Sequence, residues 1–543
     1  MPDNKEVKKK IFESSSLSVI FLYLSYIINI INTFLIVRLI SPEEWGLLLL
    51  AISFLNFAVF LTSFIPPSAQ TSINFYIPQL LAEKEKTEDE LVSFVYYNYK
   101  NRFFFSLLIY IIFCIIILLS NFETQTFQII MVLSPLILIN TFQNLNISLL
   151  LAFQKFKRVF LINMLNLLIK TMGYIIIFYF QLGNPLILLT SMNIIQGISC
   201  FSIALFSIIP LVKIKRKTNH KLNYKDYKKN FQELQKNFAL SLTISSLISQ
   251  FVGVLINILY VNSGMIIFIT YISVCEHAIG FIVNTSSSKQ ASPIFSQLYK
   301  ENKPAFKHYI IKYLKYASLA NAVMVGFMFS FIEIYIGLVY IEAYFILITI
   351  IQFYVILTFS RLILRTLGMI SSSTNNTKII LQLNIFQVSF NILSVILVII
   401  FSSFELLIFL LIISSYLATI VSFILINHYT SVDLKIRDIY KPVLLFLPSF
   451  FIAFFLSFFI NIKIFGNFIF IDIVLNSSIK FLIFLIVLYL TLYLTRYITQ
   501  DEFDNIIEII PILRSKNKYI QKIVNTIKFF FPTEKKEDLA KKE

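Results

Sequence analysis

The sequence is poor in charged residues, in cysteine and in glycine, and each shortage excludes a class of protein. Only 14% of the residues are Asp, Glu, Lys or Arg, against about a quarter in an ordinary soluble chain, so a soluble protein is excluded. The three cysteines lie far apart in apolar runs and form neither a disulfide framework nor a zinc-binding spacing. The eleven glycines form no phosphate-binding loop, and the four histidines form no HExxH motif. We therefore expect no cofactor and no metal.

Long apolar runs dominate the rest of the sequence. Hydrophobic residues make up 57% of the 543 residues, in runs of about 18 to 25 residues that match the length needed to cross a bilayer. The fold class that this pattern predicts is an all-α polytopic membrane protein with about fourteen transmembrane helices. The expected spans are 15–37, 47–78, 103–120, 127–150, 159–180, 184–212, 237–260, 264–286, 309–336, 338–360, 378–401, 404–427, 442–462 and 475–495.

The positions of the basic residues predict how these helices are oriented. Nearly all of the 46 Lys and Arg residues fall on one side of the predicted membrane, together with the N-terminus and the tail. Cytoplasmic connections retain such an excess, so we predict a multi-pass protein of the plasma membrane with both termini cytoplasmic. Arg38, Lys463 and Lys480 fall on the opposite side, and Lys170 is the one basic residue expected within a span. The net charge of +17 then indicates contact with anionic membrane lipids, and we expect no nucleic-acid partner.

The connections expected on the outer side are short. Glu43 and Glu44 are the only acidic pair among them, and adjacent carboxylates in a short turn are more often solvated than reactive. Membrane glycosyltransferases generally place acidic catalytic residues in sizeable outer loops. We therefore predict that the protein is not an enzyme, and we keep an integral-membrane glycosyltransferase or ligase as the less favoured alternative.

An internal repeat divides the chain. The first six and the next six predicted helices follow one pattern, and an even number of helices in each copy makes both copies face the same way. The copies form two pseudo-symmetric six-helix lobes, with two extra helices at the C-terminal end. The predicted parts are a cytoplasmic N-terminus (1–14), an N-lobe (15–212), a basic cytoplasmic linker (213–236), a C-lobe (237–430), helices 13 and 14 (431–495) and a basic amphipathic tail (496–543).

The segment from Val37 to Glu83, which leads into the second predicted helix, resembles the entry signature of a known transporter family. The matching residues are Arg38, Leu39, Ser41, Glu44, Trp45 and Gly46. The family is that of the oligosaccharide flippases, also called polysaccharide-biosynthesis export proteins, of the multidrug/oligosaccharidyl-lipid/polysaccharide exporter superfamily. Residues 264–282 and 332–350 resemble its eighth helix and its ninth-to-tenth turn.

This resemblance implies a cavity between two lobes and transport by alternating access. The implied function is translocation of a polyprenyl-phosphate-linked or pyrophosphate-linked oligosaccharide from the cytoplasmic to the outer leaflet, for surface polysaccharide or glycoprotein assembly. The implied partners are this lipid-linked substrate and the enzymes that assemble the glycan. An ion-coupled multidrug or metabolite exporter of the same superfamily is the alternative.

Polar side chains within the spans are the candidate substrate-binding residues, because polar groups in a bilayer usually face a cavity or a partner. Lys170 shares one helix face with Asn163 and Asn166, and its ammonium group can attract a phosphate. Amides that can bind sugar hydroxyls, and arginines at the cavity mouths, complete the set: Asn29, Asn32, Arg38, Asn384, Gln387, Asn391, Arg361 and Arg365. The alternative roles are a lysine that reaches the membrane surface along its own stem, amides that join packed helices, and arginines that anchor helix ends to head groups.

Three titratable residues in the C-terminal half are the candidates for ion coupling: Glu276, His277 and Glu333. A carboxylate within a span can carry a coupling proton or bind Na⁺, so H⁺ or Na⁺ is the expected coupling ion. The alternative is a structural role as the partner of a buried cation, which for Glu276 includes Lys170 across the lobes.

Overall fold

The computed structural model is helical throughout the part of the chain that it describes. The described residues are 24–65, 73, 87–120, 122–153, 155–181, 183–215, 248, 250–285, 303–374, 377–430, 432–457, 469–495, 497 and 500. No strand occurs among them. Among these residues, ten helices are long and apolar enough to cross a membrane, and three shorter apolar helices accompany them. Each predicted span overlaps a described helix, which confirms the all-α polytopic membrane fold.

Some predicted features lie outside the described residues. They are the N-terminus 1–14, the linker beyond Lys215, the amphipathic helix of the tail and the outer residue Lys463. The linker was predicted to begin at 213, whereas α8 continues to Lys215.

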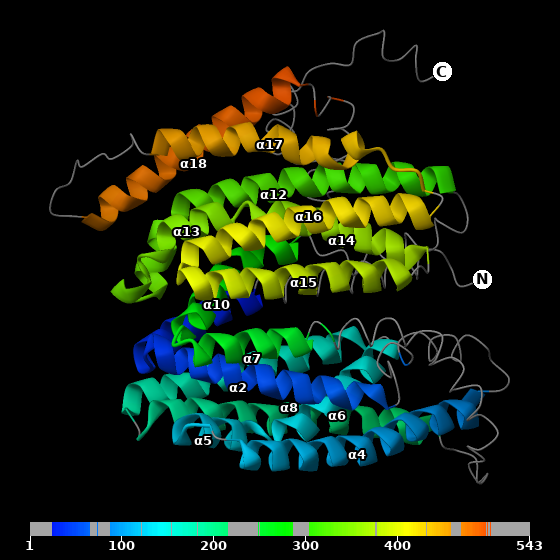
Figure 1. The fold of residues 1–543 in the computed structure, drawn as a ribbon. Coiled ribbons are helices and arrows are strands. Elements are labelled where there is room, and N and C mark those ends of the chain that lie inside the picture. Colours follow the sequence, from blue (N-terminus) through cyan, green and yellow to red (C-terminus); the bar gives the residue numbers. More distant parts are fainter. Residues whose placement is uncertain are drawn as a thin grey trace, which may run out of the picture. The chain divides into compact units, whose positions relative to one another are not determined.

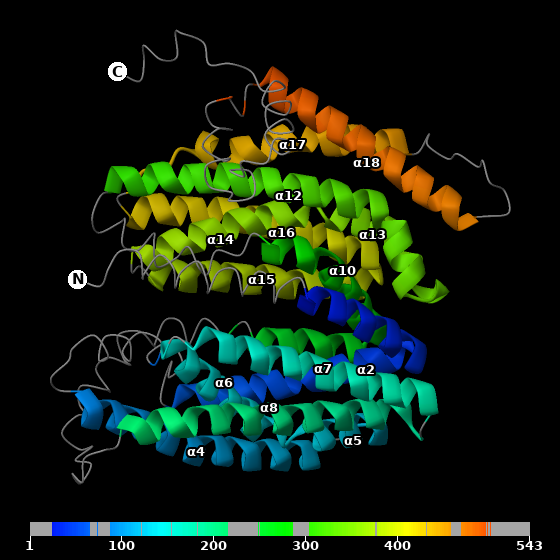
Figure 2. The same ribbon diagram turned by 180° about the vertical axis from the view of Figure 1, so that it is seen from behind.

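The helices of the N-lobe pack against one another around α2, α6 and α8. These helices are Leu24–Leu39, α2 (Pro42–Leu61) with the short η1 (Thr62–Phe64), α4 (Thr87–Leu119), α5 (Thr124–Leu133), α6 (Leu136–Ala152), α7 (Phe156–Phe180) and α8 (Pro185–Lys215). Figure 1 shows α2 and α4 to α8 side by side, and Figure 2 shows the same group from behind. A core of fully buried residues that includes Phe94, Leu145 and Ile162 joins α4, α6 and α7.

The sequence explains where α2 begins. Ser41 is its N-cap and accepts a hydrogen bond from the Glu44 amide at 3.2 Å, while the Glu44 carboxylate accepts one from the Ser41 amide at 2.9 Å. This reciprocal capping box satisfies two amides that a helix start leaves without partners, and Pro42 at the first helical position suits the same site. Part of the family signature therefore serves to start α2 at a defined residue.

In the C-lobe, α10, α13 and α15 pack around α14 and α16. The described helices of this lobe are Gln250–Asn262, α10 (Ile266–Thr285), α12 (Lys303–Val339), η3 (Glu342–Tyr344), α13 (Leu347–Tyr354), α14 (Leu357–Ser373), α15 (Thr377–Phe401) and α16 (Phe404–Tyr429). One predicted span, 338–360, is replaced by the broken pair α13 and α14. The break at Val355 and Ile356 moves the residues after 360 from a predicted connection into the interior of a span that runs from Leu347 to Ser371.

The chain divides into two compact units. The first holds Met1–His308 and Tyr335–Asp433, and so contains the helices of both lobes except the middle of α12; the second holds Tyr309–Ile334 and Leu434–Glu543. In the second unit the middle of α12 packs with α17 (Ile436–Ser457) and α18 (Ile469–Leu494). Phe329 contacts Phe450 there, with the ring centroids 5.1 Å apart. The two helices predicted to follow the lobes are thus part of a body built on the centre of α12.

A buried ion pair lies within the second unit. The Lys480 ammonium of α18 lies 3.3 Å from a carboxylate oxygen of Glu333 in α12, with the two side chains 8% and 34% exposed. Lys480 was predicted on the outer side of the membrane, but it lies well within α18, where the Glu333 carboxylate neutralises its charge. The pair lets both charges remain within the apolar segment.

Replacing Lys480 by Met is expected to destabilise the second unit, because it leaves the Glu333 carboxylate without its cation. Loss of one partner of a buried pair costs several kcal/mol, and we expect about 2 kcal/mol here because Glu333 is partly exposed. Thermal unfolding in detergent measures the change. The double variant Lys480→Met/Glu333→Gln removes both charges and should regain most of the loss. A double variant as unstable as the single one would contradict this role of the pair.

Candidate functional site

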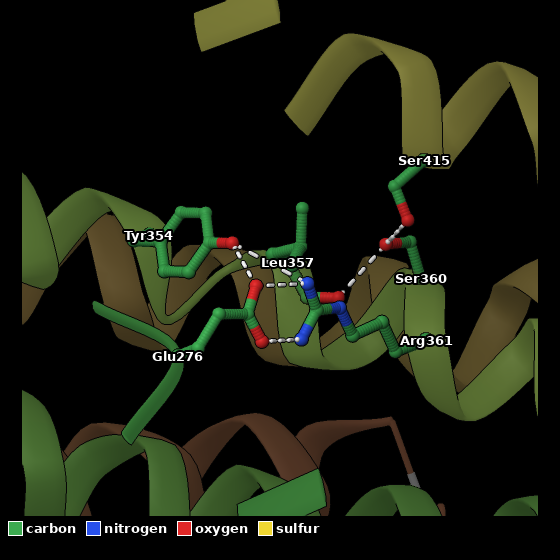
Figure 3. A network of polar contacts seen from close by, with 6 residues as sticks. All are labelled: Glu276, Tyr354, Leu357, Ser360, Arg361 and Ser415. Carbon is green, nitrogen blue, oxygen red and sulfur yellow. Dashed lines mark hydrogen bonds and ion pairs between the residues drawn. The ribbon is translucent and has the colours of Figure 1, made fainter. Parts of the chain in front are cut away.

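An ion pair between α10 and α14 lies at the centre of the candidate site. The Arg361 guanidinium donates to both carboxylate oxygens of Glu276, at 2.6 Å and 2.5 Å. The Tyr354 hydroxyl at the end of α13 also donates to Glu276, and it accepts a hydrogen bond from Arg361 at 3.3 Å. Figure 3 shows the two parallel bonds of the pair with Tyr354 beside them. The break between α13 and α14 thus brings three polar groups from three helices together.

Hydrogen bonds to α16 hold this part of α14 in place. The Ser360 hydroxyl lies 2.6 Å from that of Ser415 and donates to the Leu357 carbonyl at 2.8 Å (Figure 3). Tyr416 donates to the carbonyl of Ile356, in the break itself, at 3.1 Å. The backbone that carries Arg361 is therefore fixed on the side away from Glu276.

Two cavities meet at the ion pair. The first, which we call the arginine cavity, has a volume of about 320 Å³. Its polar lining is Tyr26, Asn29, Thr33, Glu276, His277, Tyr335, Arg361 and Arg365. It therefore lies between the first helix of the N-lobe and α10, α12 and α14 of the C-lobe, and two guanidinium groups and one carboxylate face it.

The second cavity, which we call the amide cavity, has a volume of about 310 Å³. Its polar lining is Ser53, Asn56, Gln250, Asn257, Tyr260, Glu276, Tyr354, Arg361, Asn391 and Ser394. Asn257 donates to Ser53 at 2.8 Å and so joins the helix Gln250–Asn262 to α2. Amides and hydroxyls of this kind offer both donors and acceptors, as sugar hydroxyls require. The two cavities thus share the ion pair of Arg361 and Glu276 and differ in the rest of their lining.

The structure brings only part of the predicted binding residues together. Asn29, Arg361, Arg365 and Asn391 line a cavity, as do the predicted coupling residues Glu276 and His277. Asn384 and Gln387 lie on the same helix as Asn391, but they line neither of these cavities, and Glu333 lies with Lys480 in the second unit. Arg361 was expected at the inner end of a span and instead lies within one, because its charge is satisfied by Glu276.

Lys170 lies on α7 with Asn163 and Asn166, and all three side chains are half-buried. Its ammonium group lies 5.5 Å from the centroid of the Tyr174 ring, within reach of a cation–π contact. Its charge also acts on His277 of the arginine cavity. Lys170 therefore adds positive potential beside that cavity without being part of its wall.

Asn32 is nearly fully buried and lines neither cavity. Within the described residues, both of its amide atoms lack a hydrogen-bond partner, as does the side-chain oxygen of Asn166. A buried amide without a partner is costly, so these positions are unlike the amides that join packed helices.

Arg38 lies at one edge of a contact between the two lobes. It donates to the carbonyl of Val339 at 2.8 Å, and its guanidinium lies 3.6 Å from the centroid of the Phe34 ring. It thus ties the first helix to the end of α12 and does not line the two cavities.

The starts of α2 and α10 form the rest of this contact, which we call the α2–α10 junction. Thr270 donates to the carbonyl of Pro42 at 2.7 Å, and Gly46 lies against the backbone of Ile266. Trp45 is 3% exposed, and its ring lies nearly parallel to that of His277 with centroids 6.4 Å apart. Because His277 also lines the arginine cavity, the junction adjoins that cavity.

Sequence reasoning missed the aromatic part of the site. Tyr354, Tyr335 and Tyr26 are not among the predicted residues, because a tyrosine in a span can be either a packing or a polar residue. The spacing of Tyr354 and Arg361, two helical turns apart, is the one signal that could have pointed to it. The sequence singles out Trp45 only through the resemblance to the family signature.

Comparison with known proteins supports the fold through solved structures alone. No family model matches the chain, and no curated protein matches it. An inward-facing multidrug resistance MATE family transporter of the MOP superfamily is similar with a TM-score of 0.60 and 13% identity, over 74% of this chain and 94% of that one. The lipid II flippase MurJ, in an inward closed conformation, is similar with a TM-score of 0.58 and 17% identity, over 87% of this chain and 99% of that one.

A third solved structure is a MOP superfamily transporter from Pyrococcus furiosus, described as having a binding pocket of reverse polarity. It is similar with a TM-score of 0.52 and 14% identity, over 78% of this chain and 95% of that one. The chain therefore has the fold of the MOP superfamily transporters, as the resemblance in the sequence predicted.

Proposed function

We propose that this protein is a flippase that moves a polyprenyl-phosphate-linked or pyrophosphate-linked oligosaccharide from the cytoplasmic to the outer leaflet. The observation that carries the proposal is the arginine cavity, a polar space between two lobes whose wall holds two guanidinium groups and one carboxylate. Such a wall favours an anionic head group. A charged head group crosses hydrocarbon only at high cost, so shielding it is the service that the protein provides.

The lining suits the two chemical parts of such a head group. Arg361 and Arg365 lie one helical turn apart on α14, and guanidinium groups bind phosphate oxygens through paired hydrogen bonds. The amide cavity on the other side of Arg361 supplies donors and acceptors for sugar hydroxyls. The likeness of the fold to the lipid II flippase supports a lipid-linked substrate, and the two lobes support alternating access with the lipid tail left in the bilayer.

The same fold is also that of multidrug transporters, so an ion-coupled exporter is the rival function. A cavity for organic cations needs a free carboxylate, whereas Glu276 accepts two hydrogen bonds from Arg361. In the proposed setting the protein lies in the plasma membrane with both termini cytoplasmic, contacts anionic lipids and receives its substrate from glycan-assembling enzymes. H⁺ or Na⁺ coupling through Glu276, His277 or Glu333 remains part of the proposal.

Reconstituted vesicles with a fluorescent lipid-linked oligosaccharide test the function. The wild-type protein should speed leaflet exchange well above protein-free vesicles, and Lys170→Ala should slow it about tenfold, because loss of the positive potential beside the cavity costs about 1.4 kcal/mol. The matched control is Lys378→Ala, which removes an exposed lysine from the first turn of α15. The flippase function would be contradicted if no lipid-linked glycan exchanged faster than in empty vesicles. Uptake of a quaternary ammonium dye by the same vesicles would then favour the exporter.

A further inference from the structure

Glu276 occupies the atoms of Arg361 that an anionic substrate needs. Two nitrogens of the guanidinium group donate to two oxygens of one carboxylate. A phosphate group presents a similar pair of oxygens and forms the same fork with arginine. While the pair is intact, Arg361 therefore has its strongest donors engaged.

The pair remains open to the cavities. The side chains of Arg361 and Glu276 are 29% and 39% exposed, whereas the ammonium-bearing side chain of the structural pair in the second unit, Lys480, is 8% exposed. Arg361 and Glu276 also line both the arginine cavity and the amide cavity. A ligand in either cavity can thus reach the guanidinium group without unfolding the helices around it.

Tyr354 gives the carboxylate a second partner. Its side chain is nearly fully buried, and its hydroxyl donates to Glu276. If the carboxylate leaves Arg361, it keeps this hydrogen bond and stays beside His277, so it is not left without a donor. An arginine without a counter-charge within a span is costly, which explains why the empty site needs a substitute anion at all.

We infer that Glu276 stands in for the phosphate group of the substrate on Arg361 while the cavity is empty, and that the substrate binds by displacing it. Glu276 is then a positioning residue that competes with the substrate. The inference rests on the proposed function, since it concerns the same cavity and an anionic lipid-linked ligand. It predicts that neutralising Glu276 raises the affinity for an anionic ligand, whereas neutralising Arg361 lowers it.

Binding of farnesyl pyrophosphate to the purified full-length protein tests this, with farnesol as the probe that lacks the anion. Glu276→Gln keeps the shape of the side chain and removes its charge, so it should bind the pyrophosphate about tenfold more tightly than wild type. Arg361→Gln should bind it at least about tenfold more weakly. The matched control is Glu405→Gln, which alters an exposed carboxylate at the start of α16 and should leave the affinity unchanged.

Weaker or equal binding by Glu276→Gln would overturn the inference and leave a structural ion pair. If that variant does not fold, Glu276→Asp shortens the side chain by one methylene and should still bind more tightly than wild type, by a smaller factor. A wild-type protein that binds farnesol and farnesyl pyrophosphate equally would contradict the proposed function itself. The two failures are therefore distinguishable.

Discussion

Replacing Arg361 by Gln is expected to lower the rate of leaflet exchange of a lipid-linked oligosaccharide roughly a hundredfold, which corresponds to about 2.7 kcal/mol. Hydrogen bonds to charged groups contribute about 1.5–3 kcal/mol each, and Arg361 offers a phosphate two of them. Glutamine is neutral and cannot form the paired contact. The measurement is the exchange rate in reconstituted vesicles, at matched protein content.

Two further variants separate transport from folding. Arg361→Lys keeps the charge but loses the planar fork, so an intermediate rate is expected. Glu276→Gln/Arg361→Gln removes both charges; it should recover the thermal stability that Arg361→Gln loses, because no carboxylate is left without its cation, but it should not recover transport. Near wild-type exchange in Arg361→Gln would show that this guanidinium group does not bind the substrate.

The class of fold could be predicted from sequence because it depends on local properties. A run of about 20 apolar residues is long enough to cross a bilayer whatever surrounds it, so every predicted span overlaps a helix of the structure. The start of α2 was predicted too late, at residue 47, because apolar runs alone do not register the capping box of Ser41 and Glu44 that starts the helix at Pro42.

The charged residues could not be placed in this way, because their placement depends on partners far away in the chain. Arg361 was assigned to the end of a span, but Glu276, 85 residues earlier, lets it lie within one. Arg102 was likewise assigned to a connection. It is buried in α4 and donates to the carbonyl of Thr62, where α2 passes into a short 3-10 helix. A hydropathy profile treats each such cation as the end of a span, and it contains no information about the distant group that the cation contacts.

Uncharged polar residues that recur along one face of a helix could not be placed from sequence either. Periodicity correctly puts Asn384, Gln387 and Asn391 on one helix, α15. Of these three, only Asn391 lines a described cavity. Which turn of a stripe reaches a cavity depends on how the neighbouring helices pack, and one helix in isolation does not specify that.

Replacing Gly46 by Val is expected to separate the two helices at the α2–α10 junction. A Cβ atom at Gly46 would lie 2.8 Å from the carbonyl oxygen of Ile266 and 2.9 Å from its Cγ1. Because the oxygen belongs to the backbone of α10, it cannot turn aside, and the helices must move apart. The hydrogen bond from Thr270 to Pro42 and the stacking of Trp45 on His277 would then be lost.

Tryptophan fluorescence measures this change directly, because Trp45 is the only tryptophan of the chain and is buried at the junction. In Gly46→Val its emission should shift to longer wavelength, and quenching by acrylamide should rise several-fold. Leaflet exchange should fall about tenfold, since the proposed alternating access would require the lobes to close beside the arginine cavity. The matched control is Gly337→Val, where a Cβ atom meets nothing within 4 Å. If acrylamide quenched Trp45 equally in Gly46→Val and Gly337→Val, the result would contradict the proposal that the α2–α10 junction holds the lobes together beside the cavity.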